Sequence, residues 1–219
     1  MGIRRFTPGI GLCLALAGTW TAAAPVSAAT APNAGRLARQ VLISRHDLGP
    51  GWTVQAAAPS QAAPLTCPVF RPATPGVVRR AAAASPTFAE SQSGPFVSQT
   101  SYVYGSAAQE RIVWTRVVRP ALARCFAAAL VHGGSSGVSF AVTATHTFAL
   151  GVHNATVAGY RVEGTASGSG QSMPVVVDSI VLGRGRTISA LSLSSFDQAP
   201  SRGLESRLAA LIARRTAGG

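Results

Sequence analysis

Side chains alternate strictly between two faces along residues 96–104, a period of two that is typical of a β-strand. Four further segments rich in Val, Ile, Thr or Phe follow a glycine and serine turn, at 138–150, 156–166, 172–182 and 187–195. The breaks between these four segments are too short for parallel crossovers, which need about a dozen residues or more. The pattern therefore predicts an antiparallel meander.

Three other segments have helical periodicity: 36–43, 107–130 and 201–215. In the middle segment, Ser106 precedes Gln109 by three residues, which is a capping-box spacing. Pro120 interrupts the same segment, and because proline removes a helix hydrogen bond, we expect a kink or two consecutive helices there. Residues 56–84 are rich in Ala and Pro without a clear period, which predicts loop with one short helix.

The order of these elements predicts an α+β fold, with an antiparallel sheet of about five or more strands and the helices packed on one face of it. A turn-rich stretch, residues 46–52, ends in Trp52, which we expect to anchor this bend to the core.

The N-terminus is typical of a secretory signal peptide. Two arginines precede an apolar run, and the small residues Val26, Ser27 and Ala28 suit cleavage after Ala28. We expect residues 1–28 to be a signal peptide, 29–35 a flexible leader and 36–219 a single domain, secreted or held in the cell envelope. The alternative of lipid attachment at Cys13 has the wrong preceding residue, Leu12, and no other segment has the length of a membrane span.

All 19 basic residues are arginine, against seven acids, and the formal net charge is +12. A surface this basic favours anionic partners such as envelope polymers or lipid headgroups. Nucleic acid fits less well, because the arginines are scattered and aromatic residues are few. We expect no nucleic-acid partner.

Two cysteines lie beyond the predicted cleavage point, Cys67 and Cys125. In an oxidising compartment, an even pair in a small exported domain predicts a disulfide. The alternative is a catalytic thiol, but neither cysteine has an activating neighbour in sequence.

The sequence contains no recognisable catalytic or metal-binding motif, and we predict no cofactor, no metal and no catalytic residue. The four histidines lack the tight spacing of a zinc site. Asp47 beside His46 is better explained as a side chain that caps a turn than as part of a triad. Glu163 and Asp178 lie in neighbouring predicted strands and stay open as the carboxylate pair of a hydrolase, against the simpler interpretation that they pair with arginines.

Residues 183–186, Gly-Arg-Gly-Arg, superficially match a phosphate loop but lack its lysine and its strand-to-helix setting. A hairpin turn between two strands is the better interpretation. Arg184 and Arg186 would still be available to contact an anion.

Several short motifs occur together in one order: residues 42–52 with the sequence Leu-Ile-Ser to Gly-Pro-Gly-Trp, then a cysteine, then Tyr104-Gly105-Ser106, then 119–125 ending in Cys125. This order resembles actinobacterial exported domains that are similar to the PknH extracellular sensor domain, and small mycobacterial lipoproteins with a Mog1/PsbP-like α+β fold. The resemblance covers most of the predicted domain. It departs from the kinase sensors in having no transmembrane helix or kinase and a single cysteine pair.

The resemblance implies a ligand cleft between sheet and helices and no defined enzymatic activity. The leading hypothesis is therefore a non-enzymatic exported domain that binds a small envelope-derived ligand or a partner. An envelope-acting hydrolase and an arginine-rich docking module for an anionic polymer or protein are the alternatives. Cavity volume separates the ligand binder from the docking module.

Overall fold

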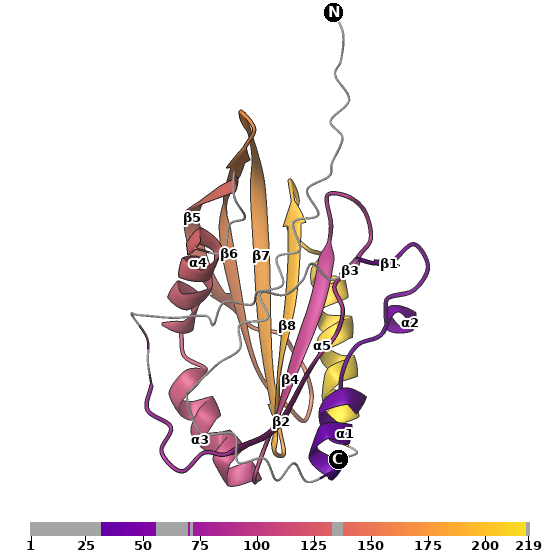
Figure 1. The fold of residues 1–219 in the computed structure, drawn as a ribbon, viewed down its shortest axis with the longest axis vertical. Helices are drawn as coiled ribbons and strands as arrows, with labels where there is room; N and C mark the ends of the chain where they lie inside the picture. Colours follow the sequence, from indigo (N-terminus) through magenta and orange to yellow (C-terminus); the bar gives the residue numbers. More distant parts are fainter. Residues whose placement is uncertain (1–31, 56–69, 71, 133–137, 218–219) are drawn as a thin grey trace, which may run out of the picture.

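The computed structural model describes residues 32–55, 70, 72–132 and 138–217. One antiparallel sheet of eight strands runs through this part of the chain, in the order β1-β3-β4-β8-β7-β6-β5, with β2 paired to β4 (Figure 1). The α+β class is confirmed. The strands are β1 Thr53–Val54, β2 Arg79–Ala84, β3 Phe88–Ala89, β4 Phe96–Tyr104, β5 Val138–Phe148, β6 Thr156–Gly168, β7 Gln171–Arg184 and β8 Thr187–Phe196.

The helices are α1 Pro32–Gln40, α2 Arg45–Leu48, α3 Ala107–Val117, α4 Leu122–His132 and α5 Arg202–Thr216. The division at Pro120 is as the sequence predicts, with α3 ending before it and α4 beginning after it. Ser106 caps α3, since its hydroxyl accepts a hydrogen bond from the Gln109 amide at 3.2 Å. The first helix begins at Pro32, so part of the predicted flexible leader is helical.

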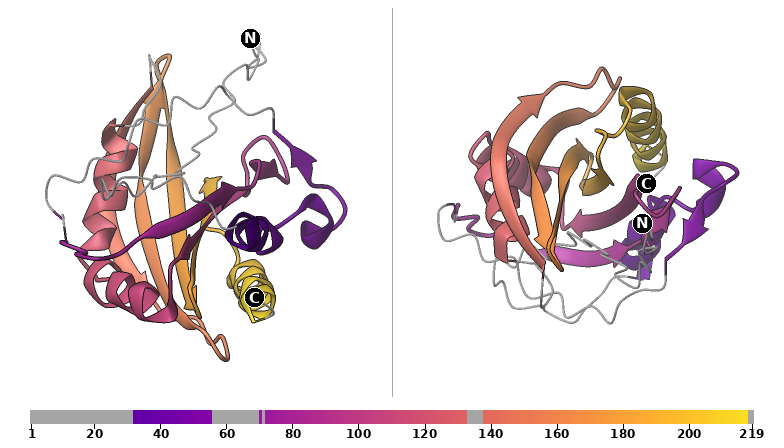
Figure 2. Two further views of the ribbon diagram at one scale, coloured as in Figure 1. Left: turned by 60° about the horizontal axis from the view of Figure 1, so that its bottom comes forward. Right: turned by 90° about the horizontal axis from the view of Figure 1, so that it is seen from above.

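Two predictions for the fold are wrong. The stretch predicted as loop contains β2. The sequence does not mark it as a strand because its run of alanines has no alternation of hydrophobic and polar side chains. The helices also cover both faces of the sheet (Figure 2). In β7, Val177 and Val181 pack in the core beneath α3 and α4, whereas Ile180 and Leu182 pack in the core beneath α1 and α5. Continuous apolar runs of this kind are typical of strands buried on both faces.

Trp52 is buried, as predicted, and the bend before it has positive φ angles at Gly49 and Gly51, of 98° and 88°. A β-bulge in β5 changes the pairing with β6, since Val142 pairs with Gly164 but Ala144 already pairs with Glu163. Thr143 is thus an extra residue. No helix in the described part of the chain combines the length and apolar character that a membrane crossing requires. The predicted signal peptide and its cleavage at Ala28 lie outside the described residues.

Candidate functional site

The β7–β8 hairpin carries Arg184 and Arg186 at one end of the sheet. Gly185 lies between them with a φ of 61°, which confirms the interpretation of this segment as a hairpin turn. The Nη1 atom of Arg184 donates to the Ala213 carbonyl of α5 at 3.3 Å, and the Arg186 carbonyl accepts from the Tyr104 amide at 2.8 Å. Both arginine side chains are half-buried, so the surrounding residues restrict their positions at the surface.

Other elements bring further arginines to this end of the sheet. The first residue of β2, Arg79, pairs with Tyr104 at the end of β4, and Arg80 follows it. Arg214 is exposed in the last turn of α5, next to the carbonyl that Arg184 contacts. We call this end of the sheet the basic end and define it by Arg79, Arg80, Arg184, Arg186 and Arg214.

Within the described residues, Arg80, Arg184, Arg186 and Arg214 make no ion pair with an aspartate or glutamate. Three acidic residues elsewhere, Asp178, Glu205 and Asp47, each pair with another arginine. The positive charge of the basic end is therefore available to an anion from outside.

Glu110 of α3 lies at the same end of the sheet, buried against Gly183. Its Oε1 atom has no hydrogen-bond partner among the described residues. Burial raises the pKa of Glu110 to about 7, while the charge of Arg111 acts in the opposite direction. A pKa near 7 leaves the carboxyl only partly ionised at neutral pH, so it offsets only part of the positive charge around it.

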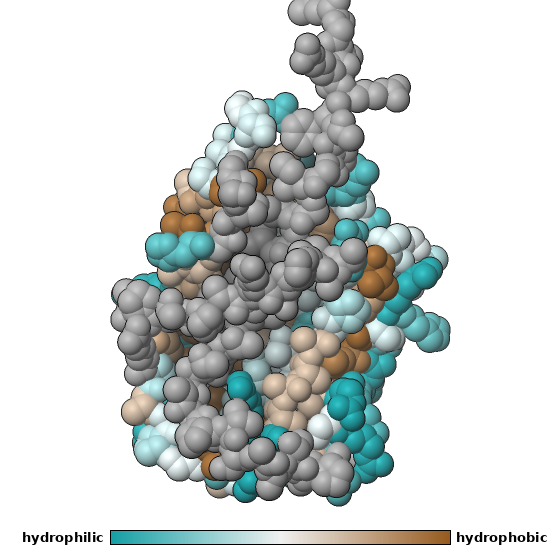
Figure 3. All heavy atoms as spheres, viewed as in Figure 1, coloured by the Kyte–Doolittle hydropathy of each residue, from teal (hydrophilic) through white to brown (hydrophobic). Residues whose placement is uncertain are grey.

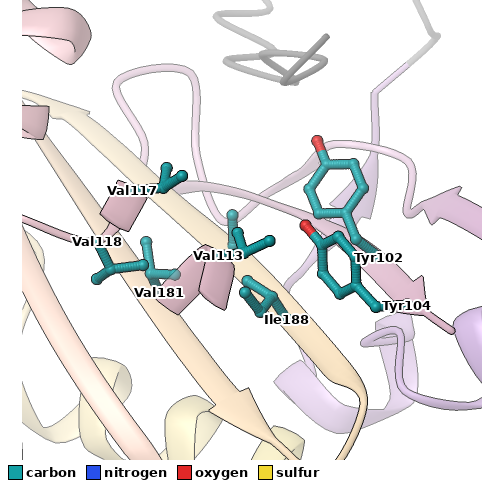
Figure 4. Close-up of a pocket in the computed structure, with 8 residues that line it drawn as sticks. Tyr102, Tyr104, Val113, Val117, Val118, Val181 and Ile188 are labelled. Carbon is teal, nitrogen blue, oxygen red and sulfur yellow. The ribbon is translucent and has the colours of Figure 1, made fainter. Parts of the chain in front are cut away.

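An apolar pocket lies on the α3 side of β4, lined in part by Tyr102, Tyr104 and Ile188 (Figure 4). The two tyrosine rings lie side by side, facing valines of α3 and β7. Its volume is about 10 Å³, which holds about one water molecule. This pocket cannot hold a small-molecule ligand. Burial, reinforced by the neighbouring Tyr102, raises the pKa of Tyr104.

The hydrophobic residues visible between the grey atoms in Figure 3 form small scattered groups, and hydrophilic residues follow the side where α1 lies. Among the described residues, Val54 and Val131 are the exposed large hydrophobic ones. Neither observation indicates a broad apolar binding face in the part that is visible.

The two residues of the predicted carboxylate pair, Glu163 and Asp178, have different surroundings. Asp178 is fully buried and accepts two hydrogen bonds from Arg161, at 2.7 and 2.6 Å, as the arginine-pairing interpretation expects. Glu163 is on the same face but is partly exposed, and its nearest ionisable partner is His146, at 4.0 Å. Asp178 is thus held by Arg161 away from solvent, whereas Glu163 is in part accessible.

A buried acid that the sequence analysis did not identify, Glu205 of α5, extends this ion-pair cluster. Its Oε2 atom accepts from Arg202 at 2.6 Å and its Oε1 atom lies 3.5 Å from Nη2 of Arg161. The Arg202 guanidinium lies over the ring of Phe148, 3.7 Å from its centre. The Arg161, Asp178, Glu205 and Arg202 side chains thus tie α5 to the sheet.

Glu205 has a perturbed pKa. Burial and the neighbouring Asp178 raise the pKa of Glu205 to about 7, although Arg202 opposes the shift. A pattern in the sequence could have identified it, since residues 205, 208, 209 and 212 form one helical stripe in which the other members are apolar.

The remaining candidate residues have structural roles or lie outside the described part. Asp47 caps the turn at Ser44, accepting hydrogen bonds from its amide and hydroxyl at 2.7 and 2.8 Å, as predicted. Burial tends to raise the pKa of Asp47, but hydrogen bonds from Arg215 and Ser44 outweigh it and lower that pKa. Within the described ranges, no three His, Cys, Asp or Glu side chains gather as metal ligands. Cys125 is buried in α4, while Cys67 lies outside the described residues, so the disulfide stays a prediction.

No protein-family model matches the chain, and no curated protein is significantly similar to it in sequence.

Proposed function

We propose that the chain is an exported, non-enzymatic binding domain of the sensor or lipoprotein type, and that its basic end docks on an anionic polymer of the cell envelope. The observation that carries this proposal is that β2, the β7–β8 hairpin and the last turn of α5 bring five arginines to one end of the sheet. Four of these arginines have no acidic partner among the described residues. Fixed cations that are close together attract a multivalent anion more strongly than the same charges scattered over a surface.

Two observations in the structure and one expectation from the sequence support docking in preference to catalysis or enclosed ligand binding. The described apolar pocket is too small for an organic ligand. The buried carboxylate Asp178 is held by Arg161 and faces no described cleft. Export would place the basic end among envelope polymers, as the N-terminal sequence and the resemblance to exported sensor domains suggest.

The test measures the affinity of the purified protein for dextran sulfate by fluorescence anisotropy, at two salt concentrations. A triple variant replaces three arginines of the basic end with glutamine, and a matched variant removes the same charge from exposed arginines elsewhere. The first carries Arg80→Gln, Arg184→Gln and Arg186→Gln, and the second carries Arg116→Gln, Arg119→Gln and Arg124→Gln.

We expect the basic-end variant to lose roughly tenfold or more in affinity and to show a weaker salt dependence than the wild type. The matched variant should lose much less. An equal loss in both variants would mean that only net charge matters and would contradict the proposal.

A further inference from the structure

The outer edge of β5 is the end of the hydrogen-bonded sheet. β5 pairs with β6 on one side, and no other described strand pairs with it on the other side. Six of its eleven residues are exposed: Ser139, Ala141, Thr143, Thr145, His146 and Thr147. An edge strand presents unpaired backbone N–H and C=O groups, which can pair with another strand.

This edge lacks most of the features by which proteins usually protect such strands. Residues 138–148 contain no Asp, Glu, Lys, Arg or Pro, and β-branched residues are frequent among them. The one protective feature is the bulge at Thr143. At the other margin of the sheet, by contrast, β1 and β3 have two residues each, and β2 opens with Arg79 and Arg80.

The charge distribution indicates which partner fits. The chain has a formal charge of +12, so two copies repel each other over most of their surfaces. The β5 edge is a neutral strip: His146 is the one titratable residue on β5, and it faces Glu163 across the β5–β6 pair. The arginine opposite His146 in register, Arg161, is paired with Asp178. Two copies can therefore approach along β5 with little repulsion.

We propose that β5 is a self-association edge, at which the β5 strands of two copies pair antiparallel and join their sheets. An antiparallel pair of identical strands has two-fold symmetry, so each copy contributes the same surface and the assembly closes at two copies. Strands of this length extend for about 35 Å, long enough for a continuous ladder of backbone hydrogen bonds on both sides of the bulge.

The first measurement is the molar mass of the purified protein by light scattering, from micromolar to the highest soluble concentration. A charged variant carries Ala141→Lys and Thr145→Lys on β5, and a control adds the same charge at the exposed β6–β7 hairpin with Gln171→Lys and Ser172→Lys. Like charges brought opposite each other across two strands oppose pairing. We expect the wild type and the control to form dimers. The dissociation constant of the β5 variant should be at least about tenfold higher than that of the wild type.

Hydrogen exchange of the wild type provides a second readout that does not depend on how the variants fold. Amides of β5 that point outward should be protected in the dimer and should exchange faster on dilution. A wild type that is monomeric at every concentration would overturn the proposal, as would a dimer whose stability is unchanged in the β5 variant. Pairing of β5 with some other protein, without self-association, would also overturn it.

Discussion

The buried carboxyl of Glu205 makes the stability of this fold depend on pH in a direction opposite to that of most carboxylates. The side chain is fully buried beside Asp178, and its pKa of about 7 replaces an ordinary value of 4.5. Because the folded state holds this proton more tightly than the unfolded chain does, it gains stability relative to the unfolded state as pH falls from about 8 to 5. The substitution Glu205→Gln removes the titration and keeps the shape.

The magnitude follows from the two pKa values. A group that titrates near 7 in the folded state and at 4.5 in the unfolded state contributes roughly 2–3 kcal/mol between about pH 8 and pH 5. As pH falls from 8 to 5, we expect the free energy of unfolding of the wild type to rise relative to that of Glu205→Gln, and the difference between the two proteins to grow by that amount. Glu110 adds a similar slope to both proteins, so the difference between them isolates Glu205.

The assay is urea denaturation, followed by circular dichroism, at several pH values from 5 to 8. Glu163→Gln is the matched control, because it makes the same chemical change at a partly exposed position on the same face of the sheet. The control should follow the wild type closely. If Glu205→Gln and the wild type had parallel pH profiles, the proton would not be held at Glu205 and the reasoning would be refuted.

Two other parts of the structure give sharp expectations. Gly183→Ala would place a methyl group against the Glu110 carboxyl, and we expect it to lower the free energy of unfolding by about 2 kcal/mol. In Gly203→Ala of α5, the added methyl group meets no atom within 4 Å, and the free energy of unfolding should rise by about 0.5–1 kcal/mol. A loss in both, or in neither, would contradict the packing described at Gly183. Arg215→Met removes the ion pair to Asp47 and should cost about 1–2 kcal/mol near pH 7. Because the pKa of Asp47 is lowered, that cost should shrink as pH falls through this pKa, and a pH-independent cost would mean that the ion pair is not its source.

Local patterns in the sequence predict the elements of this fold well where the physical signal is itself local. Pro120 cannot continue a helix, and α3 and α4 accordingly lie on either side of it. The side chains at 96–104 alternate because β4 contacts different layers on its two faces, and the glycines between later strands form short turns. These features depend on a few neighbouring residues, which is why they can be predicted from the sequence.

The candidate site and the ion-pair cluster depend on contacts that no local pattern contains. Arg161 meets Asp178 because β6 and β7 pair in one register, and meets Glu205 because α5 crosses that face of the sheet. The basic end likewise combines residues from three parts of the chain. Arg184 and Arg186 stand out in the sequence, but no local pattern brings Arg80 to the same end of the sheet, because the residues of β2 do not have the pattern of a strand.

The extra residue at Thr143 has a consequence for how this chain tolerates insertions and deletions. Phe140 and Phe148 are both even-numbered positions of β5, yet they pack in the two different cores on opposite faces of the sheet. They do so because the bulge shifts the alternation by one residue between them. Loss of one residue at this point would therefore turn Phe148 away from Arg202 without shortening the strand appreciably. Related sequences that keep this fold should thus conserve the spacing from Phe140 to Phe148 more strictly than the identity of Thr143.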